Sequence, residues 1–100
     1  MITQERKQML KKYRKLISAD PSFSKEEKEI ILDVLNKLSW DFYKKSFSLR
    51  IQLRQVKLLL NKPEHSQAKK HFVHCVYLLG KREVAIDVFS QLSNWYNKHK

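Results

Sequence analysis

The stretch that decides the fold is SFSLRIQLRQVKLLLN, residues Ser46–Asn61. Its first half alternates apolar and polar residues as a β-strand does, with apolar side chains at Phe47, Leu49, Ile51 and Leu53. The alternation then fails, because Gln55 is polar and Val56 begins a largely apolar run. No second strand with a credible turn exists to pair with it, and an isolated strand would leave its backbone groups unpaired. We therefore predict a helix here.

As a helix, this stretch carries two apolar stripes and one basic edge. The first stripe consists of Leu49, Leu53, Val56 and Leu60, and the second of Phe47, Ile51 and Leu58. Between the stripes, the spacing i, i+4, i+7 aligns Arg50, Arg54 and Lys57. We expect a helix that contacts two neighbouring elements and turns its basic edge to water.

The scarcity of glycine and proline predicts the same fold class for the whole chain. Its 100 residues include one Gly and two Pro, against average usage of about 7% and 5%. β-Sandwiches and barrels need many tight turns, which usually contain these residues. A chain of this length suits one domain with a modest core. We predict a single all-α domain over residues 1–100, an antiparallel bundle of four to five helices.

Four further helices are predicted on either side of the central one. The first begins after Thr3 and runs to about Ile17. The second begins at the sequence SKEE, where Ser24 and Glu27 can form a capping box. The fourth follows NKPEHSQ and ends at Gly80, the position of a left-handed C-cap. The fifth runs on to the polar tail NKHK.

Aromatic residues form a candidate partner-binding strip. Leu32, Trp40 and Tyr43 lie outside the main apolar arc of the second helix. A second apolar strip on one helix indicates either burial on two sides or a surface for a partner. We assign Trp40 and Tyr43 to the strip, together with Trp95 of the fifth helix.

The charge of the chain is strongly positive, with 21 Lys and Arg against 10 Asp and Glu, a formal balance of +11. From Phe42 to Arg82 the only acid is Glu64, against ten Lys or Arg. Such a balance favours an anionic partner, which is nucleic acid, phospholipid headgroups or an acidic protein face; a solvated lysine-rich surface is the alternative. The candidate basic partner-binding residues are Arg50, Arg54, Lys57, Lys69 and Lys70.

His71 and Cys75, one turn apart on the fourth helix, raise two chemical hypotheses. They could share a zinc ion, but a structural site needs four ligands, and no distant Cys or suitable His pair supplies the rest. They could also act as base and nucleophile. Cys75 lies in the apolar stripe of its helix, however, and burial raises the pKa of a thiol. We therefore predict no enzyme activity, no metal and no cofactor.

The location of the protein is predicted from three absences in the sequence. Cys75 is the only cysteine and has no partner for an internal disulfide, which indicates a reducing compartment. The N-terminal sequence MITQERKQMLKKYRKLI has no continuous apolar region, so no signal peptide is expected. No run approaches the roughly 20 apolar residues that span a bilayer. We expect a cytoplasmic protein, at most peripheral at the inner membrane surface.

The order of these segments resembles the immunity proteins that protect lactic acid bacteria and their relatives from pediocin-like (class IIa) bacteriocins. The resemblance covers about Leu16 to Leu79 and rests on FSKEEKEIILDVLNKL, the basic leucine-rich third helix and NKPEHSQAKKHFVHCVYLL. It implies a cytosolic antiparallel bundle without catalytic activity that recognises a bacteriocin-occupied membrane permease from inside and blocks its pore. It also implies that specificity lies in the half beyond about Leu59, although the regular fifth helix departs from the family's loose tail.

Two other functions fit the same residues. A small basic nucleic-acid-binding or regulatory protein, of phage or mobile-element type, would contact phosphates through the basic residues without reading sequence. Trp40 or Tyr43 would then stack on a base. A helical adaptor would instead bind another protein, or a second copy of itself through Leu32, Trp40 and Tyr43.

Overall fold

The computed structural model describes residues 3–39, 46–80 and 84. Four α-helices and one short 3-10 helix occupy this part of the chain: α1 (Gln4–Ser18), α2 (Lys25–Leu38), α3 (Phe47–Leu60), η2 (Pro63–His65) and α4 (Ser66–Leu78). Since these residues contain no strand, the predicted all-α class is confirmed, and the stretch that decides the fold is helical. The predicted fifth helix lies almost entirely outside the described residues.

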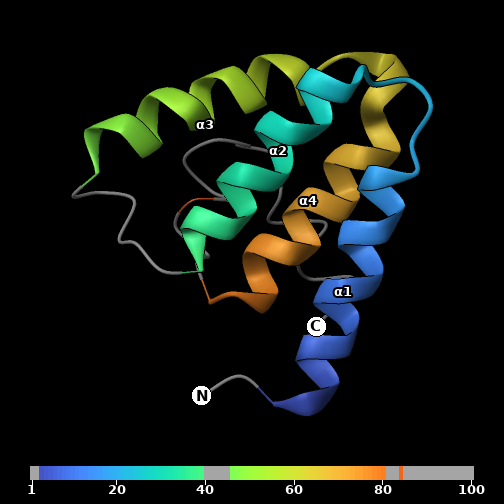
Figure 1. Cartoon of the computed structure of the whole chain (residues 1–100), viewed down its shortest axis with the longest axis vertical. Coiled ribbons are helices and arrows are strands. Elements are labelled where there is room, and N and C mark those ends of the chain that lie inside the picture. The colour runs from blue at the N-terminus through green and yellow to red at the C-terminus, as the bar shows by residue number, and fades with distance from the viewer. Residues whose placement is uncertain (1–2, 40–45, 81–83, 85–100) are drawn as a thin grey trace.

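The helices pack with α1 running antiparallel to both α2 and α4, while α3 runs across the top of the view (Figure 1). The most extensive contact joins α1 to α4, and α3 packs chiefly on α2 and less on α4. None of the helices in the described part is long and apolar enough to cross a bilayer.

Hydroxyl side chains cap the starts of three helices. Thr3 accepts a hydrogen bond from a backbone N–H in the first turn of α1, and Ser46 does the same for α3. At α2, Ser24 Oγ accepts from the Glu27 N–H at 3.2 Å, and the Ser24 N–H donates to Glu27 Oε1 at 2.8 Å. The predicted capping box and the predicted start after Thr3 are therefore confirmed.

Gly80 adopts the left-handed conformation just after the end of α4, as predicted. Its φ of +75° lies in the left-handed region, which residues other than glycine adopt only at an energetic cost. A Cβ added at this position would meet no atom within 4 Å. The requirement for glycine is therefore conformational and does not arise from crowding.

The core is built from one apolar stripe on each helix. Its fully buried side chains in the described part include Ile17, Ile31, Val34, Leu35, Leu38, Phe72, Val73, Cys75 and Val76. The predicted first stripe of α3, which is Leu49, Leu53, Val56 and Leu60, is buried as expected. These four residues face α2 and α4 together.

The second predicted stripe of α3 is not buried. Phe47 is 70% exposed, Ile51 42% and Leu58 73%. The expectation that α3 contacts two neighbours was correct, since α3 packs on both α2 and α4. That arrangement was also expected to account for the second stripe, and this part was wrong, because both neighbours lie against the same side of α3. The opposite side of the helix is left to solvent.

Candidate partner-binding surface

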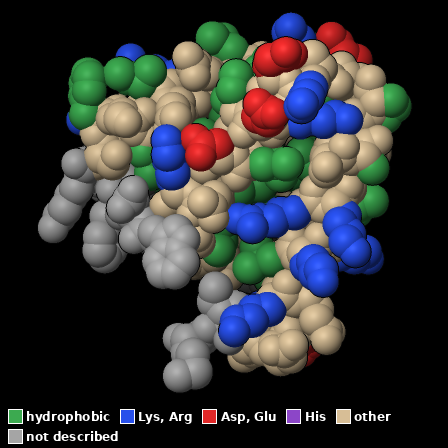
Figure 2. Space-filling model, viewed as in Figure 1, with side chains coloured by type: hydrophobic (Ala, Val, Ile, Leu, Met, Phe, Trp, Pro, Cys, Tyr) green, Lys and Arg blue, Asp and Glu red, His purple; other side chains and the backbone are tan. Residues whose placement is uncertain are grey.

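The outer face of α3, defined here as Phe47, Arg50, Ile51, Arg54, Lys57 and Leu58, is the candidate functional site. Helical periodicity places its three apolar side chains on the side of the helix opposite the buried stripe. Its three cations are exposed and follow one flank of the apolar residues. Hydrophobic and basic side chains adjoin one another over α3 in the space-filling view (Figure 2).

The cations of this face are available to a partner. The Arg50 guanidinium carbon lies 5.7 Å from the centre of the Phe47 ring, a weak cation–π contact at an exposed site. Within residues 3–39 and 46–80, no carboxylate forms an ion pair with Arg50, Arg54 or Lys57. An approaching anion would therefore not have to displace a carboxylate of the described residues.

A polar network on the flank of α3 that faces α2 sets the direction of the outer face. Lys37 Nζ donates to Gln52 Oε1 at 3.0 Å and pairs with Asp33 Oδ2 at 3.1 Å. Gln52 Nε2 also donates to Asp33 at 3.4 Å. The three side chains link α3 to α2, and they keep the apolar residues of the outer face turned away from the core.

The structure separates the predicted basic residues into two groups. Arg50, Arg54 and Lys57 align on α3 as predicted, whereas Lys69 and Lys70 belong to the first turns of α4. Lys70 is exposed and Lys69 is half-buried. The predicted aromatic strip of Trp40, Tyr43 and Trp95 lies outside the described residues.

A serine, a histidine and an aspartate meet where α2 and α4 begin, and sequence reasoning missed them. The Ser22 hydroxyl donates to Asp20 Oδ1 at 2.6 Å and lies 2.8 Å from His65 Nδ1. In a hydrolase triad the histidine stands between serine and carboxylate. Here the serine stands in the middle, and the His65 ring is stacked on Phe23 with centroids 4.0 Å apart. The arrangement therefore joins two turns and does not activate the hydroxyl.

The Asp20 carboxylate is held in its charged form by this arrangement. Partial burial raises the pKa of Asp20. Hydrogen bonds from the Ser22 hydroxyl and backbone N–H, together with the charges of His65 and Lys28, lower the pKa by more than burial raises it. The sequence DPS does signal a turn in which aspartate accepts from the backbone two residues on. Nothing in the sequence signals that Ser22 also contacts His65.

His71 and Cys75 do not form a reactive pair in the structure. The Cys75 thiol is fully buried, and this burial raises its pKa to about 12. The His71 ring stacks on Tyr13 with centroids 5.5 Å apart, and Tyr13 also stacks on His74 at 4.4 Å. Burial lowers the pKa of His71. The negative charge of Asp20 raises this pKa, whereas the positive charges of Lys12 and Lys70 lower it further. The histidine is thus a neutral packing residue at pH 7.

No cluster of three or more metal-binding side chains occurs within the described ranges. The arrangement best suited to function is the outer face of α3, which can bind a surface that is both apolar and anionic. Comparison of the chain with models of protein families, with curated proteins and with solved structures finds no match.

Proposed function

We propose that this protein is a bacteriocin immunity protein of the pediocin-like type, acting by non-covalent recognition of a bacteriocin-occupied membrane permease from the cytoplasmic side. The observation that carries the proposal is the outer face of α3, where exposed apolar and basic side chains adjoin. The resemblance of the segment order to that family supports the same function.

The chemistry of this face suits a partner at the inner membrane surface. Exposed apolar groups that lie together on a folded protein mark interaction sites, and burying them would stabilise a complex by roughly 25 cal/mol per Å². Near an anionic leaflet, each of Arg50, Arg54 and Lys57 would add about 1 kcal/mol. A permease embedded among anionic lipids presents an apolar surface and an anionic surface side by side.

A challenge assay tests the proposal. The chain is expressed in a strain sensitive to pediocin-like bacteriocins, and survival is measured against a panel of these peptides. We expect selective survival against one or a few of them, and weaker protection by Ile51→Ala and Leu58→Ala. Uniform killing of cells that contain the folded, expressed protein would refute immunity.

Leu16 provides a matched control for the apolar part of the face. It is 41% exposed, against 42% for Ile51, but it lies on α1. Leu16→Ala should therefore leave protection unchanged. Equal loss of protection in Leu16→Ala and Ile51→Ala would show that the effect is general and does not belong to α3.

Nucleic-acid binding is the contrasting hypothesis for the same cations. It predicts binding that weakens steeply with salt, and a smaller salt dependence when Arg50, Arg54 and Lys57 are replaced together by Ala. The apolar residues beside them favour the first proposal, since phosphate contacts need no leucine at position 58. Salt-dependent gel shifts that leave Leu58→Ala unaffected would support nucleic acid instead.

A further inference from the structure

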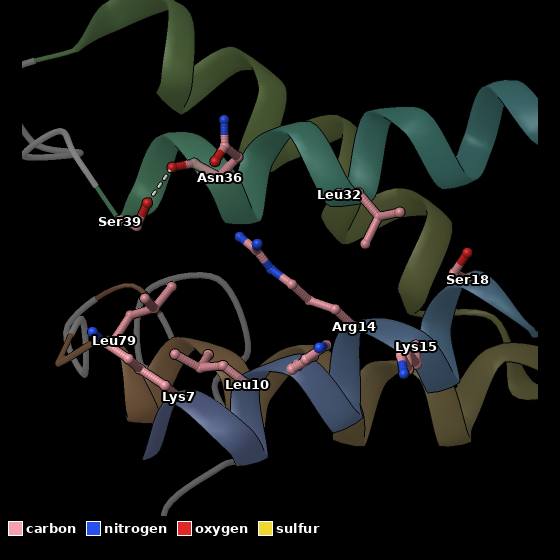
Figure 3. A pocket seen from close by; sticks show the side chains of 10 residues that line it. Lys7, Leu10, Arg14, Lys15, Ser18, Leu32, Asn36, Ser39 and Leu79 are labelled. Carbon is pink, nitrogen blue, oxygen red and sulfur yellow. Dashed lines mark hydrogen bonds between the residues drawn. The ribbon is translucent and has the colours of Figure 1, made fainter. Parts of the chain in front are cut away.

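A groove between α1 and α2 forms a second surface, which shares no residue with the outer face of α3. Its volume is about 650 Å³. The residues that line it come from α1, α2 and the end of α4, and are Lys7, Leu10, Lys11, Arg14, Lys15, Ser18, Leu32, Asn36, Ser39 and Leu79 (Figure 3). The space-filling view shows hydrophobic side chains at the bottom of this hollow and Lys and Arg around it (Figure 2).

The apolar part of the groove is built by three half-buried leucines. These leucines, Leu10, Leu32 and Leu79, pack against the hydrophobic core, while part of each side chain remains accessible to solvent. Leu32 lies outside the main buried arc of α2, and its place in the groove explains why that helix carries an additional apolar position. A ligand with apolar groups would find these leucines already in position.

The described charged residues that line the groove have one sign. Among the lining residues that the structure describes, four are Lys or Arg from α1 and none is Asp or Glu. The Arg14 side chain leaves α1 and extends across the groove toward α2, ending near Asn36 (Figure 3). Arg14 is half-buried, and no carboxylate of the described residues pairs with its guanidinium. A half-buried guanidinium that pairs with no carboxylate of the described residues is well placed to hold one from a ligand.

The shape of the groove indicates what kind of ligand it would take. Along α1 its lining runs from Lys7 to Ser18, which at 1.5 Å per residue is about 16 Å, or three helical turns. Small-molecule sites enclose about 70–90% of their ligand. This groove is bounded by two helices and open on its outer side, so a ligand would keep one face in water. A helix with one apolar stripe meets that requirement.

We propose that the groove is the docking site for an acidic amphipathic helix of a partner protein. The partner's apolar stripe lies on Leu10, Leu32 and Leu79, and a carboxylate of the partner pairs with Arg14 while others face the lysines of α1. The proposal goes beyond immunity and does not depend on it, because the two surfaces are built from different residues.

Charge separates this occupant from two others. The chain's own segment 85–100 carries a single acid, Asp87, and two lysines, so it does not complement the groove. A second copy of the chain brings a further formal charge of +11, which opposes self-association through a basic surface. An acidic partner is attracted by both the groove and the net charge.

The test uses a fluorescein-labelled helical peptide of about 16 residues, with leucines on one stripe and glutamates beside it. Fluorescence anisotropy with the full chain should show saturable binding. We expect Arg14→Gln and Leu32→Ala each to weaken binding about tenfold. The matched control is Lys62→Gln, which removes one positive charge at an exposed position outside both the groove and the outer face of α3 and should change the affinity less than about twofold.

Further measurements decide the outcome if one variant is poorly folded. Lys11→Gln changes an exposed groove residue and should also weaken binding, while circular dichroism reports folding of every variant. Equal weakening by Arg14→Gln and Lys62→Gln would overturn the proposal in favour of unspecific charge attraction. Equal binding of a peptide with lysine in place of glutamate would also overturn it. Saturable binding of oleate that displaces the peptide would assign the groove to a small amphiphile instead.

Discussion

The Nδ1 atom of His65 lies 2.8 Å from the hydroxyl oxygen of Ser22, although 43 positions separate the two residues in the sequence. Ser22 belongs to the turn that precedes α2, and His65 ends η2, immediately before α4. His65 is only 4% exposed and is stacked on Phe23. This contact therefore joins the starts of α2 and α4, two helices that are far apart in the sequence.

Replacing Ser22 tests how much this contact contributes to stability. Ser22→Ala removes the hydrogen-bonding partner of a buried imidazole nitrogen, which should lower the free energy of unfolding by about 1–3 kcal/mol. Urea denaturation followed by circular dichroism measures the change. Ser48→Ala, at an exposed position of α3, is the control and should change stability by less than about 0.5 kcal/mol. Equal stability of the two variants would contradict the assigned role.

The capping box of α2 should make stability depend on acid pH. The backbone N–H of Ser24 donates to the Glu27 carboxylate and lowers its pKa below the ordinary value of 4.5. A lowered pKa in the folded state means that the contribution is present above 4.5 and is lost as pH falls through the folded value. Thermal unfolding should show Glu27→Gln less stable than the unmodified chain at pH 7 and equal to it in strong acid. Equal stability of Glu27→Gln and the unmodified chain at pH 7 would contradict the assigned role.

The two stripes of α3 predict opposite mutational sensitivity on one helix. Leu53 is buried, so Leu53→Ala should destabilise the fold by about 2–5 kcal/mol. Leu58 is 73% exposed, so Leu58→Ala should cost less than about 0.5 kcal/mol. Chemical denaturation compares the two variants directly. Similar losses at both positions would mean that the outer face is covered in solution.

The thiol of Cys75 should be inert in the native protein. Because it is buried and its pKa is raised to about 12, very little reactive thiolate forms or meets solvent at pH 8. Labelling with a maleimide should be slow in buffer and rapid in denaturing urea. A Ser48→Cys variant supplies an exposed thiol as the positive control. Rapid native labelling at Cys75 itself would show that α4 opens readily.

Local signals in the sequence were sufficient for much of the fold. The capping box at Ser24, the cap at Thr3 and the left-handed turn at Gly80 all depend on residues within a few positions of one another, and all three are confirmed. The helical assignment of Ser46–Asn61 also rested on local periodicity and on the lack of a strand to pair with it. Such interactions can be predicted from the sequence because both partners lie within a few positions of each other in the chain.

The candidate sites were predicted less completely. The sequence placed Arg50, Arg54 and Lys57 on one edge of a helix, and the structure agrees. It did not reveal the exposure of Phe47, Ile51 and Leu58, because periodicity identifies apolar faces without showing which of them find a neighbour. The groove beside Arg14 was not foreseen either, since its walls come from separate helices.

The sequence by itself determined the helical class, the helix starts, the basic character and the buried stripe of α3, because hydrogen bonds and side-chain spacing within one helix are properties of consecutive residues. Only the tertiary structure decided that α2 and α4 share one side of α3, that Ser22 meets His65, and that Arg14 crosses a groove lined by leucines. Those relationships arise from packing between segments distant in the chain, where each helix is positioned by the burial of its own apolar stripe.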